Sequence, residues 1–275
     1  MRKLGSLPFL LLLLAAAAAG FFYTVSKEVI PCVTPITFSL VSYDSRFGAP
    51  EQEIELDMRR AATVWNDALG MKALVEASGT PELPVSFVYD DTQATVDTID
   101  ELSGDIDTLK SQLTDVANQY GTFKKQYDSL NAKGQATQAM YDGLQTLYQR
   151  YEALRAKINS DVAQGQALPS GSVEEGLYTS DASGTRITIY AFQDKNELMR
   201  TLIHEFGHAL GLGHVSNPDS IMYPSNDASQ STTLTKEDLA ELSRACAIAR
   251  AQPNAVLYEY EQRILHAFGL DKGTS

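Results

Sequence analysis

The sequence predicts an α+β domain that is interrupted by an antiparallel α-helical coiled-coil hairpin. Three observations predict this fold class: alternating segments typical of strands flank the middle of the chain, amphipathic helices follow them, and the middle itself carries a heptad pattern. The chain has 275 residues, of which 44% are apolar and 21% charged. This length and composition suit one domain with an accessory element and exclude a disordered chain or a multi-span membrane protein.

The first 25 residues are expected to direct export. A basic opening, Met1-Arg2-Lys3, precedes an uncharged apolar run over residues 7–25. This pattern is typical of a signal peptide cut after Ala19, and the same segment left uncut would be an N-terminal membrane anchor. Either interpretation predicts a secreted or extracytoplasmic protein that contacts a membrane only through this segment, if it stays uncleaved.

Cysteine usage and charge exclude several classes of site. The two cysteines of an exported chain are interpreted as one disulfide, Cys32–Cys246, the alternative being two small buried thiols. Two cysteines are too few for a Cys-rich zinc finger or an iron–sulfur cluster. A net charge of -13 without a basic stripe excludes nucleic acid as a partner.

The main domain is predicted to start with a strand, a helix and a second strand within residues 26–92. Residues 36–43 alternate apolar and polar side chains, and residues 84–89 form a second strand-like run. Residues 51–69 are predicted to be a helix that ends before Gly70. Its apolar face consists of Ile54, Met58, Ala61, Ala62, Trp65 and Leu69.

The hairpin is predicted within residues 93–168. Apolar and aromatic residues recur at alternating steps of three and four from Ile99 to Leu130, which is typical of a coiled-coil seam. Residues 132–135 break the pattern, and it resumes from Met140 to Val162. The alternative is that both helices are ordinary bundle helices of the main domain. The seam contains several tyrosines, which suit intramolecular pairing or a partner's helix better than a long homodimer.

The main domain is expected to resume over residues 169–250. Two strands, at residues 176–179 and 186–192, precede a helix over residues 196–210. A further helix is predicted from Thr235, its N-cap, to residue 249. Residues 251–275 are expected to be a C-terminal helical tail with a short helix at residues 254–268.

Three of the four histidines form the strongest chemical signal. His204, His208 and His214 lie in the pattern H-E-x-x-H-x-x-G-x-x-H. The first two are one helical turn apart and can face one metal ion, while Gly211 can turn the chain so that His214 approaches from another direction. Three imidazoles leave a position on Zn²⁺ open for water, which predicts one catalytic zinc ion. Glu205 is placed to accept a proton from that water as general base.

The motif and its surroundings resemble the metzincin zinc endopeptidases. A methionine, Met222, follows eight residues after the third histidine, as in the Met-turn of that clan. The strand from Pro35 to Phe47 and the helix containing Trp65 are similar to those of the matrixin branch, the matrix-metalloprotease-like group. The resemblance covers roughly residues 33–90 and 175–248. It implies a metzincin-like catalytic domain with a twisted mixed sheet, an active-site helix and a cleft for a protein or peptide substrate.

The resemblance also implies roles for further residues. Met222 would form a hydrophobic floor beneath the zinc, and Tyr223 and Pro224 would begin the wall of the pocket for the substrate residue after the scissile bond. Arg200 occupies the position that reaches the base of that pocket in matrixins, where a long cationic side chain would shorten the pocket or favour an acidic or polar end group. Structural Ca²⁺ near Asp181 or Asp219 is a further hypothesis, although neither lies in a readable loop pattern.

The chain departs from the matrixin pattern in three ways. Val215 stands where matrixins usually have a serine after the third histidine. The histidines for a second, structural zinc are missing, since His266 lies far away in the tail. A cysteine-bearing pro-segment is not recognisable before the first strand, and the neighbours of Cys32 do not match the family's cysteine switch.

The sequence therefore predicts an exported zinc-dependent endopeptidase. The alternative is a non-catalytic envelope or adhesion module that presents the coiled-coil arm, although Glu205 and all three histidines are retained. Since the arm is inserted where matrixins form the rim of the cleft, we expect its base to lie near bound substrate and the arm to dock a protein substrate or partner. An inert spacer is the alternative role for the arm.

Overall fold

A computed structural model describes residues 29–168, 175–225 and 231–267, which form two compact units. Of these residues, 29–89, 175–225 and 231–267 belong to one unit, and residues 90–168 belong to the other. The predicted signal peptide or anchor, residues 1–25, lies outside the described residues. Among the described residues, none of the helices has both the length and the apolar character that crossing a bilayer requires.

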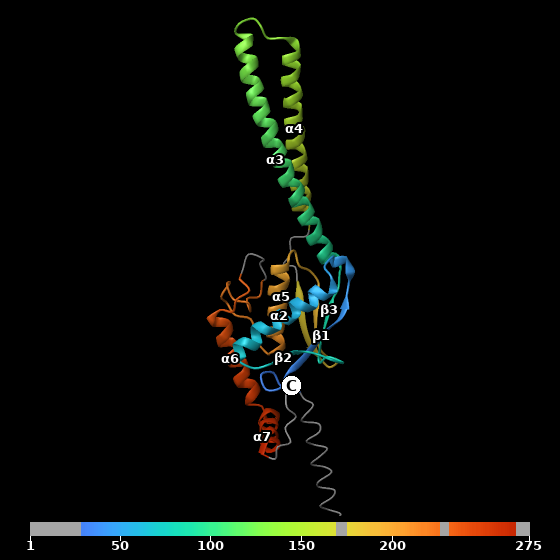
Figure 1. Cartoon of the computed structure of the whole chain (residues 1–275), viewed down its shortest axis with the longest axis vertical. Coiled ribbons are helices and arrows are strands. Elements are labelled where there is room, and N and C mark those ends of the chain that lie inside the picture. The colour runs from blue at the N-terminus through green and yellow to red at the C-terminus, as the bar shows by residue number, and fades with distance from the viewer. Residues whose placement is uncertain (1–28, 169–174, 226–230, 268–275) are drawn as a thin grey trace, which may run out of the picture. The chain divides into compact units, whose positions relative to one another are not determined.

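The first unit is built on a five-stranded mixed sheet (Figure 1), which confirms the predicted fold class. The strands are β1 (Ile36–Tyr43), β2 (Leu74–Glu76), β3 (Leu83–Phe87), β4 (Gly176–Asp181) and β5 (Gly184–Ile189), in the spatial order β2-β1-β3-β5-β4. The first four in that order run parallel, whereas β4 pairs antiparallel with β5 and lies at an edge of the sheet. The edge position leaves one side of β4 without a neighbouring strand in the sheet.

Two helices pack against each other and supply much of the core. They are α2 (Glu51–Leu69) and α5 (Lys195–Ala209), and the indole Nε1 of Trp65 on α2 donates to the carbonyl of Ile203 on α5 at 2.7 Å. Ile54, Met58 and Trp65 are buried at the spacing that the sequence predicts for one helical face. The Trp65 bond fixes the rotation of α5, and so the direction in which its polar residues point.

Some strand boundaries differ from the predicted ones. Strand β3 ends at Phe87 rather than residue 89, and β5 starts at Gly184 and ends at Ile189 rather than residue 192. Beyond these ends the aromatic rings cluster instead of extending the sheet: Phe47 stacks on Phe192 at 5.2 Å and meets Tyr89 edge-on at 5.5 Å. Strand β2 is absent from the sequence prediction because three residues are too few to show alternation.

The second unit is an antiparallel helical hairpin of α3 (Asp91–Asn131) and α4 (Gln138–Ala167), as predicted. Two cross-helix ring pairs show its register: Tyr120 lies 6.3 Å from Tyr148, and Tyr127 lies 6.4 Å from Tyr141. The pairs are one heptad apart on each helix and run in opposite directions, as an antiparallel coiled coil requires. Tyr141 and Tyr148 remain about half exposed, at 46% and 49% of the residue surface.

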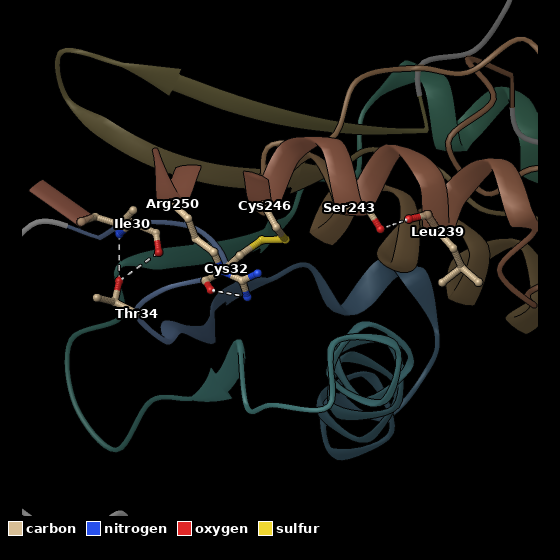
Figure 2. Close-up of a disulfide and its surroundings, with 7 residues drawn as sticks. All are labelled: Ile30, Cys32, Thr34, Leu239, Ser243, Cys246 and Arg250. Carbon is tan, nitrogen blue, oxygen red and sulfur yellow. Dashed lines mark hydrogen bonds between the residues drawn. A yellow bond between two sulfur atoms is a disulfide. The ribbon is translucent and has the colours of Figure 1, made fainter. Parts of the chain in front are cut away.

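A disulfide joins Cys32 to Cys246, the pair expected from the sequence (Figure 2). Cys246 belongs to α6 (Lys236–Arg250), which is followed by α7 (Pro253–Ala267). Near the bond, the side chain of Ile30 packs with Ala249 and Ala255. The cross-link spans 214 residues, and chain-entropy estimates for loops longer than 100 residues are about 5 kcal/mol. The disulfide thus ties the beginning of the first unit to its last helices.

Candidate metal centre

Helix α5 carries the first two histidines of the motif. Asp194 caps its start by accepting hydrogen bonds from the backbone N–H groups of Asn196 and Glu197. Leu198, Leu202 and Phe206 are buried against the core, so the helix is held along its length. His204 and His208 lie one turn apart on the remaining face, with ring centroids 4.7 Å apart.

A turn after α5 brings the third histidine to the first two. Gly211 has φ of +88°, a left-handed conformation that favours glycine, and its N–H donates to the His208 carbonyl at 2.9 Å. His208 Nε2 lies 3.0 Å from His204 Nε2 and 3.2 Å from His214 Nε2. The turn therefore makes the three imidazoles converge through one nitrogen each.

The other ring nitrogens show which protonation state the site favours. Nδ1 of His204 lies 2.6 Å from the Ile221 carbonyl oxygen, and Nδ1 of His208 lies 2.9 Å from that of Leu212. Since a carbonyl oxygen can only accept, both Nδ1 atoms carry protons. Burial lowers the pKa of His204 to about 4 and also lowers the pKa of His208, so both rings are neutral at pH 7.

This geometry fits a bound cation. The Nε2 atoms of neutral His204 and His208 present lone pairs to each other at 3.0 Å, an arrangement that is repulsive unless a positive charge lies between them. A set of three histidine nitrogens is a typical ligand set of catalytic Zn²⁺ sites. The group of His204, His208 and His214 is also the only set of three or more potential metal ligands within the part of the chain that the structure describes.

Glu205, the expected general base, lies beside the first ligand and is 4% exposed. Its carboxylate approaches the backbone at the start of the edge strand β4: a Cβ atom on Gly176 would lie 3.1 Å from Glu205 Oε1 and 2.6 Å from Thr201 Cγ2. A side chain at position 176 would therefore displace Glu205 or Thr201. This closeness of Glu205 to a sheet edge is not evident from the sequence.

Met222 is buried beneath the helix that carries the first two ligands. A Cβ atom on Gly207 would collide with the Met222 thioether and would lie 2.9 Å from Trp65, so glycine is required between them. The Met222 carbonyl accepts a hydrogen bond at 2.9 Å from the backbone N–H of Val215, the residue after the third ligand. This backbone bond does not depend on the side chain at position 215, where matrixins usually have serine. It links the turn around Met222, called the methionine turn below, to residues 211–215, called the ligand loop below.

Asp238, on α6, holds the same turn and was not singled out from the sequence. Its fully buried carboxylate accepts from the backbone N–H groups of Ile221 at 3.0 Å and Met222 at 2.9 Å. It also accepts from the backbone and hydroxyl of Thr235, which completes a capping box at the start of α6. The capping pattern predicted the helix start, whereas the bonds to the methionine turn depend on tertiary structure.

Arg200 is buried, with 1% of its surface exposed. Its guanidinium donates to the carbonyl of Ser220 at 2.5 Å and to that of Ser231 at 2.8 Å. In the sequence, these two residues flank the segment that starts at Tyr223 and Pro224. Tyr223 is half-buried and Pro224 exposed. The arginine therefore connects α5 to the two ends of that segment.

The two candidate calcium residues do not belong to a metal cluster among the described residues. Asp181 instead accepts from the backbone and hydroxyl of Ser183 and pairs with Arg186 at 3.0 Å. Asp219 donates its backbone N–H to the side chain of Asn217. These contacts are those of surface turns.

The chain is similar to known proteins. A family model described as Matrixin matches residues 32–245. Among curated proteins, the matrilysins of Rattus norvegicus and Mus musculus are 51% and 49% identical to this chain over 43 residues. The interstitial collagenase of Bos taurus is 46% identical over 48 residues.

These pairwise matches are short. The stretch shared with each matrilysin covers 15% of this chain and 16% of the relative, and the stretch shared with the collagenase covers 18% and 10%. The chain thus matches about a sixth of the length of either matrilysin.

Proposed function

We propose that this chain, which belongs to the matrixin family of zinc endopeptidases, is an exported enzyme that hydrolyses peptide bonds in protein substrates. The single observation that supports this most is the convergence of three imidazoles beside a buried glutamate. Export is supported by the Cys32–Cys246 disulfide, since such bonds persist in oxidising compartments. The basic and apolar start of the chain is consistent with the same conclusion.

The residues of the site have separable roles in this proposal. His204, His208 and His214 would hold one Zn²⁺ ion, which would polarise the scissile carbonyl and lower the pKa of water. Glu205 accepts a proton from the attacking water and transfers it to the leaving amine. An extended substrate could pair its backbone with the edge strand β4, whose first residue, Gly176, adjoins Glu205.

The experiment that tests the function uses the full exported protein. Zinc content close to one per chain is expected, together with cleavage of peptides that stops with a chelator and returns on adding zinc. Its intact mass shows whether residues 1–19 have been removed. Stoichiometric zinc without cleavage of any peptide in a diverse library would favour the non-catalytic module that presents the arm.

We propose that Arg200 limits the depth of the pocket for the substrate residue after the scissile bond. Its guanidinium is bound to two carbonyls that bracket the segment beginning at Tyr223, so the side chain is held in place. Arg200→Leu should shift cleavage towards larger apolar residues at that position, measured with a peptide library. An unchanged profile in a folded Arg200→Leu variant would rule the proposal out.

We propose that the hairpin docks a protein substrate or partner and takes no part in the chemistry. His204, His208, His214 and Glu205 all belong to the other compact unit. The half-exposed residues Tyr141 and Tyr148 offer apolar surface with polar hydroxyls for contact. Along the chain, the arm is inserted between β3 and β4, the edge strand proposed to bind substrate.

Replacing residues 95–163 by a short Gly-Ser linker is expected to leave zinc binding and peptide cleavage unchanged and to slow cleavage of the physiological protein. A milder variant removes one heptad from each helix, residues 121–127 and 141–147, and so keeps the Tyr120–Tyr148 pair in register. Loss of peptide cleavage together with folding in both variants would show that the arm is part of the core. Unimpaired protein cleavage in both would make the arm a spacer.

A further inference from the structure

One peptide bond in the ligand loop is held from both sides. The carbonyl of Leu212 lies 2.9 Å from His208 Nδ1, and the N–H of Gly213, on the other side of the same peptide bond, donates to Glu241 Oε1 at 2.8 Å. The peptide is trans, so these two groups point in opposite directions. A continuous line of hydrogen bonds therefore runs from the imidazole of a ligand through the peptide to a carboxylate on α6.

The carboxylate at the end of this line is itself fixed. Arg244, one turn further along α6, binds Glu241 with both Nε and Nη2, and its Nε lies 2.7 Å from Oε2. The Glu241 side chain is 13% exposed, whereas that of Arg244 is 54% exposed. The hydrogen bond from Arg244, with a smaller contribution from the Gly213 N–H, lowers the pKa of Glu241, so the group is charged at neutral pH.

We propose that Glu241 is a positioning residue for the zinc ion, acting on His208 through the Leu212–Gly213 peptide. This inference rests on the proposed zinc site. A negative charge on the acceptor of Gly213 polarises the peptide and makes the Leu212 carbonyl a stronger acceptor for His208 Nδ1. A stronger bond there fixes the ring and makes its Nε2 a better metal ligand. Because Gly213 directly precedes His214, the same bond also orients the approach of the third ligand.

The turn has other bonds that would form it without Glu241. The N–H of Leu212 donates to the Gly207 carbonyl at 3.0 Å, and the N–H of Gly211 donates to the His208 carbonyl at 2.9 Å. These bonds lie within α5 and its C-terminal turn, so the local chain path does not depend on α6. Removing the Glu241 carboxylate should therefore change the metal site more than the fold.

The test measures the zinc dissociation constant of the full protein, freed of metal, by competition with a chromophoric chelator. Glu241→Ala is expected to weaken zinc binding about 10- to 100-fold. Glu241→Gln, which keeps an uncharged acceptor oxygen, should lose less, and Arg244→Gln, which keeps Glu241 but not its partner, should lose a few-fold. Absorption of the Co²⁺-loaded protein should shift in Glu241→Ala, as expected if the His208 ligand changes.

A matched control is available on the hairpin. Glu152 and Arg155 form the same type of pair, three residues apart on α4, with Arg155 Nη1 3.3 Å from Glu152 Oε1. Glu152→Ala should leave zinc affinity and the Co²⁺ spectrum unchanged. Wild-type affinity in both Glu241→Ala and Glu241→Gln would overturn the inference, as would an equal loss in Glu152→Ala. Wild-type protein that binds no zinc would instead overturn the proposed function, and this inference with it.

Discussion

Replacing Glu205 by glutamine is expected to lower kcat/KM for peptide hydrolysis at least about 100-fold while leaving zinc bound. The amide has nearly the same shape, so it fits the space beside Gly176 that the carboxylate occupies. It cannot accept a proton from water, so the proposed acid–base step is lost. Steady-state kinetics on a peptide substrate, together with metal analysis of the same preparation, measure both parts of the expectation.

A control for this variant lies on the same helix. Glu197 accepts a hydrogen bond from the backbone N–H of Gln193 at the start of α5, and Glu197→Gln keeps an acceptor there. That variant should retain near-normal turnover. Normal turnover in Glu205→Gln would remove Glu205 from the mechanism.

Replacing His208 by alanine is expected to abolish stoichiometric zinc binding, and peptide hydrolysis with it. His208 is central among the three ligands, since its Nε2 lies within 3.2 Å of those of both His204 and His214. Losing a direct ligand should weaken zinc binding by more than the roughly 10- to 100-fold typical of outer partners. Zinc content after gel filtration, with and without added zinc, is the measurement.

The fold should tolerate this change better than the metal site does. His208 is only part-buried. Within the turn, the variant loses the hydrogen bond between His208 Nδ1 and the Leu212 carbonyl oxygen. His266→Ala, which removes the fourth histidine of the chain, serves as the control and should bind zinc normally. One zinc per chain in a folded His208→Ala variant would contradict the assignment of the ligands.

Sequence patterns predicted the features that depend on local periodicity. Apolar residues recur at helical spacing on the face of α2 that contains Met58 and Trp65, and they recur in heptads along the seam of α3 and α4. The histidines lie at fixed distances in the sequence: His204, His208 and His214. These patterns record which side of a helix faces apolar neighbours. They are sufficient to place the three histidines on one helix and the turn that follows it.

The supporting residues could not be predicted in this way, because their roles depend on distant segments. Asp238 and Glu241 look like ordinary acidic residues of an amphipathic helix, yet one binds the methionine turn and the other the ligand loop. Gly176 resembles any glycine that starts a strand until β4 is placed beside Glu205. Only the packing of α6 and β4 against α5 and its turn gives these residues their function.

The disulfide determines what becomes of the chain when a protease cuts it once. Any single cut between Cys32 and Cys246 divides the chain into two pieces that each keep one of the bonded cysteines. The connection at the tip of the hairpin includes the exposed residues Lys133 and Gln135, and exposed loop tips of this kind are preferred sites of proteolytic cutting. A nicked molecule would run as one species on a non-reducing gel and as two after reduction. Its intact mass would rise by one water, and shedding either half would require a reductant as well as a protease.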